Sequence, residues 1–377
     1  MIEPADFYQE LHRNGLTFFT GVPDSLLKDL CAYITDNVPS QQHVISANEG
    51  GALALAAGYH LATGRIPVVY LQNSGIGNLI NPLLSLTDAD VYAIPMLLII
   101  GWRGKPGERD EPQHSTQGRV MPELLAAIGL EYDVVGPETA DFGGVIQRAV
   151  QAAAAGSRPR ALLIEKGTFA TSGRDGGEPA PGYTRPQAIA RILAAIEADD
   201  ILVSTTGMTS REVFAYRESR GQTHDHDLMI VGSMGHASQI ALGLAQHRPE
   251  RRVICLDGDG AVLMHMGSLA VIGTQGPRNM VHLVINNGAH DSVGGQPTAA
   301  GSIDLSAVAL ACGYRHAGVA GSGEETDAAI RRLRDENGPA FLEIRVMSQP
   351  HTDAGRPTTT PRESKVALMQ ALEHGRS

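Results

Sequence analysis

The sequence has few cysteines, no long apolar run and fewer basic than acidic residues, and each shortage argues against a class of protein. Its three cysteines, at positions 31, 255 and 312, are odd in number and widely spaced, which indicates reduced thiols of a cytoplasmic protein rather than a disulfide framework. The longest apolar run, residues 93–101, is far too short to cross a membrane. No basic and then apolar leader follows Met1, so we expect no secretory signal.

Positive charge is in short supply, since 30 basic residues face 41 acidic ones. The formal net charge of −11 argues against a nucleic-acid partner and against an anionic membrane surface. It does not exclude a small anionic substrate, because a local site can be positive while the whole chain is negative. With 42% hydrophobic residues, the chain can bury a sizeable core, and its 377 residues suit two or three domains.

Several motifs that would identify a common enzyme class are also missing. The sequence has no Walker loop, no H-E-x-x-H helix and no G-x-S-x-G elbow. The dinucleotide pattern G-x-G-x-x-G is not met at Gly258 and Gly260, because Ala261, Val262 and Leu263 follow them. The function of this glycine pair must therefore be inferred from its other neighbours.

What the sequence does contain is a regular alternation of strand-like and helix-like segments in both halves. In the first half the alternation ends with a strand at 161–165, and a stretch dense in glycine and proline, 171–184, follows. The alternation restarts beyond this stretch. We therefore predict an α/β fold of two doubly wound parallel-sheet domains, residues 1–170 and 185–377, joined by a linker at 171–184.

One stretch places oxygen ligands at the ends of two neighbouring strands. Asp259 follows a buried strand expected at 253–256, and Asn287 follows a second strand expected at 280–285, with a helix at 261–272 between them. Open α/β sheets bind ligands at the carboxyl ends of their strands. An Asp-Gly turn alone is equally consistent with a solvated loop, but a carboxamide doublet directly after a buried strand has no packing reason. Two hard oxygen donors beside glycine amides suit a divalent cation that carries phosphate oxygens.

These two motifs, GDG at 258–260 and NN at 286–287, resemble the cofactor-binding signature of the thiamine-diphosphate-dependent enzymes. The resemblance implies that Mg²⁺ is held by the side chains of Asp259 and Asn287 and by the backbone carbonyl of Ala289. It also implies a catalytic glutamate at the start of an alanine-rich helix, here Glu49. Taken alone, Glu49 would be a first-turn acid favoured by the helix dipole. In the family, a buried carboxyl hydrogen-bonds the pyrimidine ring and drives it to an imino tautomer, and burial raises the pKa of such an acid.

The resemblance implies further cofactor contacts from three glycine-containing turns. Met234 lies where the family places an apolar side chain beneath the bent cofactor, and an ordinary core methionine is the alternative. The full set of expected cofactor contacts is Glu49, Thr206, Gly207, Met208, Gly232, Ser233, Met234, Gly258, Asp259, Gly260, Ala261, Asn287, Ala289 and His290.

Residues around the substrate are expected mainly in the first half. Asp24 and Ser25 follow the first strand, where an N-cap pair is the alternative. His114 lies in a polar segment, 102–119, that we predict to be a long loop, and it resembles the active-site histidine of related decarboxylases; a solvated loop histidine is the alternative. The expected catalytic residues are Glu49, His114, Asp24 and Ser25. The expected substrate contacts are Arg103, Lys105, Gln117, Ser292, Gln296 and Arg356. The segment 290–296 is expected to form a mobile lid.

Within this family, long phrases over nearly the whole sequence resemble the phosphonopyruvate decarboxylases, including residues 19–28, 47–59, 72–86, 111–118, 286–298 and 355–361. The chain also lacks room for the middle domain of the larger decarboxylases. The resemblance implies decarboxylation of a small anionic 2-oxo acid, 3-phosphonopyruvate, in phosphonate biosynthesis. It further implies a homo-oligomer, at least a dimer, with the active site at the subunit interface.

Three other functions stay open from the sequence. The sulfopyruvate decarboxylases share several of the same phrases, and a sulfonate and a phosphonate are both tetrahedral anions. An acetolactate-type carboligase and a non-catalytic protein that binds a metal and a diphosphate are more distant alternatives. The run from His224 to Asp227 looks like a metal site, but its polar flanks favour a solvated loop.

Overall fold

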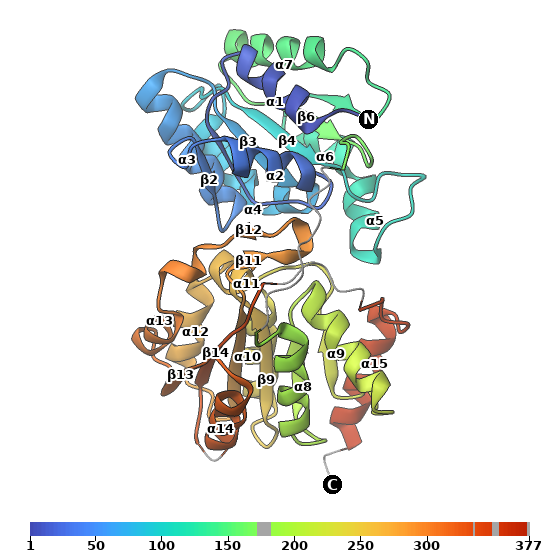
Figure 1. Ribbon diagram of the computed structural model, residues 1–377, viewed down its shortest axis with the longest axis vertical. Helices are drawn as coiled ribbons and strands as arrows, with labels where there is room; N and C mark the ends of the chain where they lie inside the picture. Colours follow the sequence, from blue (N-terminus) through green and yellow to red (C-terminus); the bar gives the residue numbers. More distant parts are fainter. Residues whose placement is uncertain (172–181, 335, 349–353, 375–377) are drawn as a thin grey trace. The chain divides into compact units, whose positions relative to one another are not determined.

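The computed structural model describes residues 1–171, 182–334, 336–348 and 354–374, apart from the side chains of Ser292 and His374 (Figure 1). The chain divides into two compact units. The first comprises Met1–Asp175 with Val293–Pro297, and the second comprises Gly176–Ser292 with Thr298–Ser377. The predicted linker at 171–184 lies mostly outside the described residues, so its bounds stay a prediction.

The first unit contains a six-stranded sheet in the order β2-β1-β3-β4-β6-β5, and every neighbouring pair in it is parallel. Its strands are β1 Phe19–Gly21, β2 His43–Ile45, β3 Val68–Gln72, β4 Leu97–Gly101, β5 Tyr132–Val135 and β6 Arg160–Ile164. Its helices are α1 Pro4–Arg13, α2 Lys28–Asn37, α3 Glu49–Thr63, α4 Ile76–Pro82, α5 Pro112–Arg119, α6 Met121–Ala127 and α7 Phe142–Gly156, with the short helices η1 Asn73–Gly75 and η2 Leu83–Thr87.

Helices cover both faces of this sheet, as the central strand β4 shows. Leu97 and Ile99 belong to one buried apolar cluster, with residues of α1, α2 and α7. Leu98 and Ile100 belong to a second cluster, with residues of α3, α4 and α6. A strand that is buried on both faces must be apolar at every position, which explains the continuous run of aliphatic residues. Each of these side chains contributes about 1.5–3 kcal/mol to stability through its burial.

The second unit contains another six-stranded parallel sheet, in the order β13-β14-β10-β9-β7-β8. Its strands are β7 Ile201–Ser204, β8 Asp227–Met229, β9 Val253–Gly258, β10 Met280–Asn286, β13 His316–Ala320 and β14 Ala340–Arg345. The helices of the remaining chain are α8 Arg185–Ala195, α9 Met208–Ser219, α10 Ala237–His247, α11 Asp259–Met264, α12 Gly267–Gln275, α13 Leu305–Ala311, α14 Gly323–Arg334 and α15 Pro361–His374. Four short elements complete it: β11 Ala289–His290, η3 Asp291–Val293, β12 Gln296–Pro297 and η4 Ala299–Ser302.

The second sheet is covered on both faces as well. Ile254 and Leu256 of β9 pack with residues of α8, α9 and α14, whereas Val253 and Cys255 pack with residues of α10, α12, α13 and α15. The predicted α/β architecture of two doubly wound parallel sheets is therefore confirmed. Among the helices of the described residues, none is long and apolar enough to cross a membrane.

Two predicted elements differ from the structure. The segment at 102–119 is not a loop throughout, because its last eight residues form α5, which begins with a proline at its first position. The single helix predicted at 261–272 is broken into α11 and α12 at His265, whose backbone is not helical (φ −132°, ψ 49°). The His265 ring lies 4.3 Å from the His236 ring, measured between centroids, so a tertiary contact accompanies the break.

Candidate active site

Asp24 is a buried carboxyl at the turn after β1, and 1% of its surface is exposed. Its Oδ2 accepts a hydrogen bond from the Leu26 amide at 3.0 Å, whereas its Oδ1 has no partner among the described residues. A Cβ on Gly101, the last residue of β4, would lie 1.9 Å from Asp24 Oδ2, so only glycine leaves room for the carboxylate. Burial raises the pKa of Asp24 to about 6, although the nearby Arg103 guanidinium opposes this shift. A carboxyl group that titrates near neutrality is suited to proton transfer.

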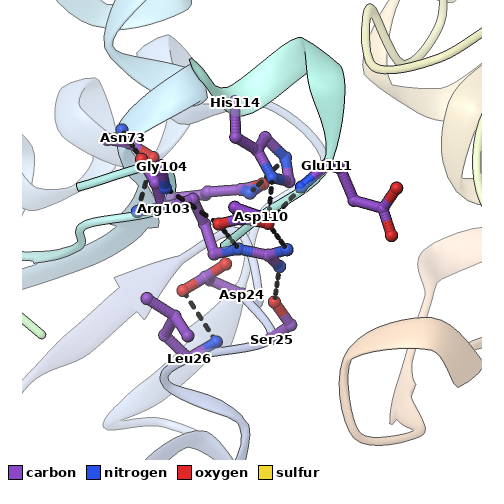
Figure 2. A network of polar contacts seen from close by, with 10 residues as sticks. Asp24, Ser25, Leu26, Asn73, Arg103, Gly104, Asp110, Glu111 and His114 are labelled. Carbon is purple, nitrogen blue, oxygen red and sulfur yellow. Dashed lines mark hydrogen bonds and ion pairs between the residues drawn. The ribbon is translucent and has the colours of Figure 1, made fainter. Parts of the chain in front are cut away.

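Arg103 is held between Ser25 and Asp110 (Figure 2). Its Nε donates to Asp110 Oδ2 at 2.8 Å, its Nη2 donates to Asp110 Oδ1, and its Nη1 donates to the Ser25 hydroxyl. The contact with Asp110 is a two-pronged guanidinium–carboxylate pair, the arrangement that fixes an arginine most firmly. Much of the charge of Arg103 is therefore offset within the chain.

His114 is a buried helical residue rather than a solvated loop histidine, since 7% of its surface is exposed and it lies on α5. Its Nδ1 lies 3.0 Å from Asp110 Oδ1, and its Nε2 lies 3.4 Å from the Gln72 side-chain nitrogen. Burial lowers the pKa of His114 against the opposing hydrogen bond to Asp110. The solvated alternative for this residue is thus wrong.

The other expected substrate contacts, which come from both units, differ in their surroundings. Lys105 pairs with Glu165, and its ammonium lies 5.7 Å from the centre of the Trp102 ring. Gln117 is half-buried, and its Oε1 has no hydrogen-bond partner among the described residues. Gln296 is buried, and neither polar atom of its side chain has a described partner. The side chain of Ser292 lies outside the described residues, and Arg356 is exposed.

Glu49 begins α3 directly after its N-cap residue, Asn48, whose side chain accepts a hydrogen bond from the Gly50 amide at 2.8 Å. Although Glu49 occupies the first turn, 5% of its surface is exposed, so it is not a solvated acid. Its Oε2 accepts a hydrogen bond from Asn78 at 2.7 Å. A Cβ on Gly75 would lie 2.3 Å from Glu49 Oε1, so this glycine makes room for the carboxyl group. Burial raises the pKa of Glu49, against the opposing effect of Asn78.

In the second unit, Asp259 is a buried carboxylate at the start of α11, with 3% of its surface exposed. Its Oδ2 accepts a hydrogen bond from the Thr298 hydroxyl, and no lysine or arginine pairs with it in the described part of the chain. Burial raises the pKa of Asp259 to about 6, against the effect of Thr298. A buried carboxylate without a cationic partner is an unfavourable arrangement unless a cation or a proton neutralises it.

The other two expected metal ligands follow β10. The Asn287 side-chain nitrogen donates to Asp291 at 2.6 Å, and its oxygen accepts a longer hydrogen bond, 3.3 Å, from the Ala289 amide. Together with Asp259, the set comprises a carboxylate, a carboxamide oxygen and a backbone carbonyl, all hard oxygen donors of the kind that Mg²⁺ prefers. The residues present therefore fit a magnesium ion that carries diphosphate oxygens.

The glycine turns of the second unit bring several expected cofactor contacts together. Thr206 accepts a hydrogen bond from the Gly232 amide at 2.9 Å, which joins the turn at 206–208 to the turn at 232–235. A Cβ on Gly260 would meet both Met234 and His290 at 3.1 Å. Met234 is half-buried and outside the apolar core clusters, so the alternative of an ordinary core methionine is wrong.

The remaining expected contacts lie on the same turns. Gly207 has a φ of +89° just before α9, and Ser233 has a φ of +47°. Gly258 and Ala261 flank the Asp259–Gly260 pair, and a Cβ on Gly258 would meet nothing within 4 Å. Met208, the first residue of α9, is buried, whereas Gly232 is half-buried. The free amides at the start of a helix suit an anion.

Sequence reasoning missed an arginine, Arg185, and three acids, Asp110, Glu212 and Asp291, that hold these residues in place. Asp291 accepts hydrogen bonds from Asn287, from Ser348 at 2.6 Å and from Arg185 at 3.1 Å. Arg185 also makes two hydrogen bonds of 3.0 Å to Glu212. One signal was available, since Arg185 is at the first position of α8, where the helix dipole disfavours a cation. Asp110 was missed although it precedes His114 by one helical turn.

The prediction of a solvated loop for His224–Asp227 is wrong in part. Asp227 is 1% exposed and opens β8, where it makes a two-pronged contact with Arg217. His224 bonds Glu218 at 2.9 Å and stacks on Phe214. The acid at 227 is thus a structural partner for an arginine, which the local sequence pattern does not distinguish from a loop acid.

The burial of Asp24 predicts a pH-dependent stability. Because folding raises the pKa of this carboxyl from 3.8 to about 6, the folded state binds more protons between these values, and stability falls as the pH rises through them. Asp24→Asn removes the free-energy cost of burying an ionised carboxylate and should raise the free energy of unfolding at pH 7.5 by up to about 3 kcal/mol. Urea unfolding measures this change, and Asp90→Asn, at an exposed site, is the control. The gain should shrink toward pH 4.5, and a gain independent of pH would contradict the raised pKa.

Known protein families and relatives match this chain over most of its length. Residues 5–124 match the model of the thiamine pyrophosphate enzyme N-terminal TPP binding domain, and residues 205–344 match the model of the C-terminal TPP binding domain. The chain is 37% identical to a phosphonopyruvate decarboxylase of Streptomyces viridochromogenes, over 96% of this chain and 93% of the relative. It is 27% identical to a sulfopyruvate decarboxylase of Methanosarcina acetivorans, over 96% of each chain.

A third relative is made of separate subunits. The sulfopyruvate decarboxylase subunit beta of Methanococcus maripaludis is 34% identical over 49% of this chain and 96% of the subunit. The subunit alpha of the same organism is 34% identical over 36% of this chain and 76% of the subunit. The two TPP binding domains, together with relatives that match over nearly its whole length, show that this chain belongs to the thiamine pyrophosphate enzyme family, as a decarboxylase (carboxy-lyase) that uses thiamine diphosphate.

Proposed function

We propose that the chain decarboxylates 3-phosphonopyruvate to phosphonoacetaldehyde and CO₂, with Mg²⁺ beside thiamine diphosphate. The observation that carries the proposal is the buried Glu49 carboxyl with its raised pKa, in a chain 37% identical to a phosphonopyruvate decarboxylase. Since the loss of CO₂ is effectively irreversible, the reaction would draw an unfavourable upstream isomerisation forward. We therefore place it in the biosynthesis of phosphonate natural products.

The two units divide the work in this proposal. Residues 1–170 form the pyrimidine-binding domain and residues 185–377 the diphosphate-binding domain, joined by 171–184. Asp259, Asn287 and Ala289 hold the metal ion, and the turns at 206–208 and 232–234 hold the diphosphate. Asp291 orients the Asn287 carboxamide, because the hydrogen bond that it accepts from the nitrogen leaves the oxygen for the metal. Arg185 and Ser348 fix Asp291 in turn.

The chain's own acids and bases supply the protons. When bound, thiamine diphosphate supplies the electron sink for the electron pair that CO₂ leaves behind. Glu49 holds a proton at its carboxyl group and hydrogen-bonds the pyrimidine ring, which its raised pKa makes feasible near neutrality. Converting a 2-oxo acid anion to an aldehyde and CO₂ consumes one proton per turnover. Asp24, with its pKa of about 6, and His114 are the groups that deliver it.

Sulfopyruvate is the second candidate substrate, because a sulfopyruvate decarboxylase matches over 96% of this chain. A phosphonate carries up to two negative charges and a sulfonate one, so the positive charge at the site decides between them. In the first unit, Arg103 and Lys105 are paired with Asp110 and Glu165, which offsets much of that charge. We assign Ser25, Gln117 and Arg103 to the tetrahedral anion of the substrate, and turnover decides which of the two anions it is.

Turnover on phosphonopyruvate, sulfopyruvate and pyruvate tests the substrate assignment. We expect kcat/KM for phosphonopyruvate to exceed that for pyruvate at least about 100-fold, since a buried polar site rejects a substrate that leaves its groups unpaired. Aldehyde release and CO₂ release are measured together at equal ionic strength. A higher kcat/KM for sulfopyruvate would assign the enzyme to the sulfonate instead.

Replacing the proposed catalytic acid tests the role of the first unit. Glu49→Gln keeps the size of the side chain and the hydrogen bond from Asn78, but it cannot share a proton. Turnover should therefore fall by about 100-fold or more, up to complete loss. Calorimetry should find the binding of Mg²⁺ and thiamine diphosphate retained. Glu123→Gln, an exposed first-turn acid of α6, is the matched control. Normal turnover of Glu49→Gln would reject the assignment.

We also propose a homo-oligomer, at least a dimer, whose active site takes Glu49 from one chain and Asp259 from the next. The separate alpha and beta subunits of the Methanococcus maripaludis relative support a site shared between chains. Co-expression of Glu49→Gln with Asp259→Asn tests it, because a mixed dimer then holds one intact site. Random pairing should restore about a quarter of wild-type activity. An active monomer in sedimentation, or no complementation, would contradict the shared site.

A further inference from the structure

Asp110 is the centre of the polar network in the first unit (Figure 2). Its two carboxylate oxygens accept five hydrogen bonds: two from Arg103, one from the His114 ring, and one each from the amides of Gly104, at 2.8 Å, and Glu111, at 2.7 Å. The side chain is 13% exposed. Burial alone would raise the pKa of Asp110, but the hydrogen bonds from Arg103 and His114 outweigh it and hold the pKa below its ordinary value. Asp110 therefore stays ionised and can only accept.

An acceptor at this place determines which nitrogen of His114 carries the proton. Because an ionised carboxylate cannot donate, the 3.0 Å contact with Asp110 requires a proton on Nδ1. The neutral ring then has a bare Nε2, on the side where the Gln72 amide lies at 3.4 Å. A buried histidine with a lowered pKa is neutral at neutral pH, so its tautomer decides whether Nε2 accepts or donates a proton.

The same carboxylate also determines where the Arg103 guanidinium lies. With Nε and Nη2 directed to Asp110, the third nitrogen of the fork, Nη1, reaches the Ser25 hydroxyl. Ser25 adjoins Asp24, whose raised pKa is moderated by Arg103. One acid thus connects the histidine on α5 to the carboxyl at the end of β1. The charged groups that act on His114 from these elements are Asp110, Arg103 and Glu111.

We infer that Asp110 is a positioning residue, which holds His114 in its Nδ1-protonated tautomer and aims Arg103 at Ser25. The inference rests on the proposed function only in taking His114 as a group that moves a proton. Asp110 is not assigned any contact with the substrate. The arrangement is that of a carboxylate behind a catalytic histidine, where a wrong tautomer disables the ring although its position is kept.

The loop around Asp110 has other supports, so a neutral replacement should fold. The Trp102 indole donates to the Gly118 carbonyl at 2.9 Å, which ties the start of the loop to α5. Asn73 exchanges two hydrogen bonds with the Arg103 backbone, at 2.9 and 3.2 Å. At Gly104 (φ +70°) a Cβ would lie 2.0 Å from the His114 carbonyl, so this close contact also holds the loop against the helix. None of these contacts depends on the charge at position 110.

The decisive measurement is the tautomer of His114, read from long-range ¹H–¹⁵N correlations of histidine-labelled protein, with His114→Gln to assign the signal. Wild type should show a proton on Nδ1 and a bare Nε2 at pH 7.5. In Asp110→Asn, which offers either an oxygen or an amide nitrogen to the ring, the signal should shift toward the Nε2-protonated form. A wild-type ring protonated on Nε2 alone would overturn the inference without any variant.

Kinetics give the second readout. Asp110→Asn should lower kcat by about 100-fold or more and displace the pH profile, while the affinity for thiamine diphosphate stays within about 3-fold. Asp110→Glu keeps the charge and should recover part of kcat together with the Nδ1 tautomer. Glu108→Gln, an exposed acid of the same loop, is the matched control for removal of a negative charge.

The outcomes separate this inference from the proposed function. If Asp110→Asn keeps both the wild-type tautomer and kcat, Asp110 does not position His114. If Asp110→Asn and Asp110→Glu lose kcat equally while the tautomer is unchanged, its role is only structural and the inference fails. If neither phosphonopyruvate nor sulfopyruvate is turned over, the proposed function fails, whereas the tautomer measurement still decides the role of Asp110.

Discussion

Burial of carboxylates without a full complement of partners is the constraint on which this structure depends. Asp24, Glu49 and Asp259 are each at most 5% exposed, and in each case burial raises the pKa. A carboxylate in such surroundings destabilises the fold unless a proton or a cation neutralises it. For Asp24 and Glu49 a glycine on a neighbouring element, Gly101 or Gly75, leaves the space that the carboxyl group needs. These acids therefore sit where the fold disfavours their charge, which suits Asp24 and Glu49 to proton transfer near neutrality and Asp259 to a bound cation.

The two sheets supply the stability that offsets this cost. Every central strand is buried on both faces, and apolar clusters of about twenty residues cover each face. Because loops at the carboxyl ends of the strands bear little of this packing, polar residues can be placed there with little loss of core. Asp24 follows β1, Asp259 follows β9 and Asn287 follows β10, so these polar residues lie at strand ends and outside the apolar clusters.

A second layer of charged residues holds the polar groups of each unit. Asp110 fixes His114 and Arg103 in the first unit, and Asp291, backed by Arg185 and Glu212, fixes Asn287 in the second. Each layer is a partly or fully buried ion pair with additional hydrogen bonds, which is costly to desolvate but restricts geometry closely. Such pairs contribute more to the orientation of the groups in front of them than to the stability of the fold.

Much of the fold could be predicted from local patterns, whereas the identity of the cofactor came from the resemblance to the thiamine-diphosphate-dependent enzymes. Runs such as Met96–Ile100 predict strands buried on both faces, and GDG and NN directly after two strands predict a metal and diphosphate site, because strand ends meet at one edge. The roles of Glu49, Asp259 and Asn287 in catalysis and in metal binding stay predictions. The loop acid expected at Asp227 is wrong, and so are the alternatives of a solvated His114 and a core Met234. All three concern burial, which local sequence does not determine.

The sequence by itself determined the two alternating β/α halves, the glycine turns and the residue types at the strand ends, because periodicity and turn chemistry act over a few residues. Only the tertiary structure decided which charges meet. Lys105 pairs with Glu165 across 60 positions of the sequence, and Arg185 pairs with Asp291 across 106 positions. Ser25 accepts a hydrogen bond from Arg103 across 78 positions. The packing of strands and helices determines which of these groups meet. The pKa of Asp24 and the position of the proton on His114 therefore depend on the tertiary structure.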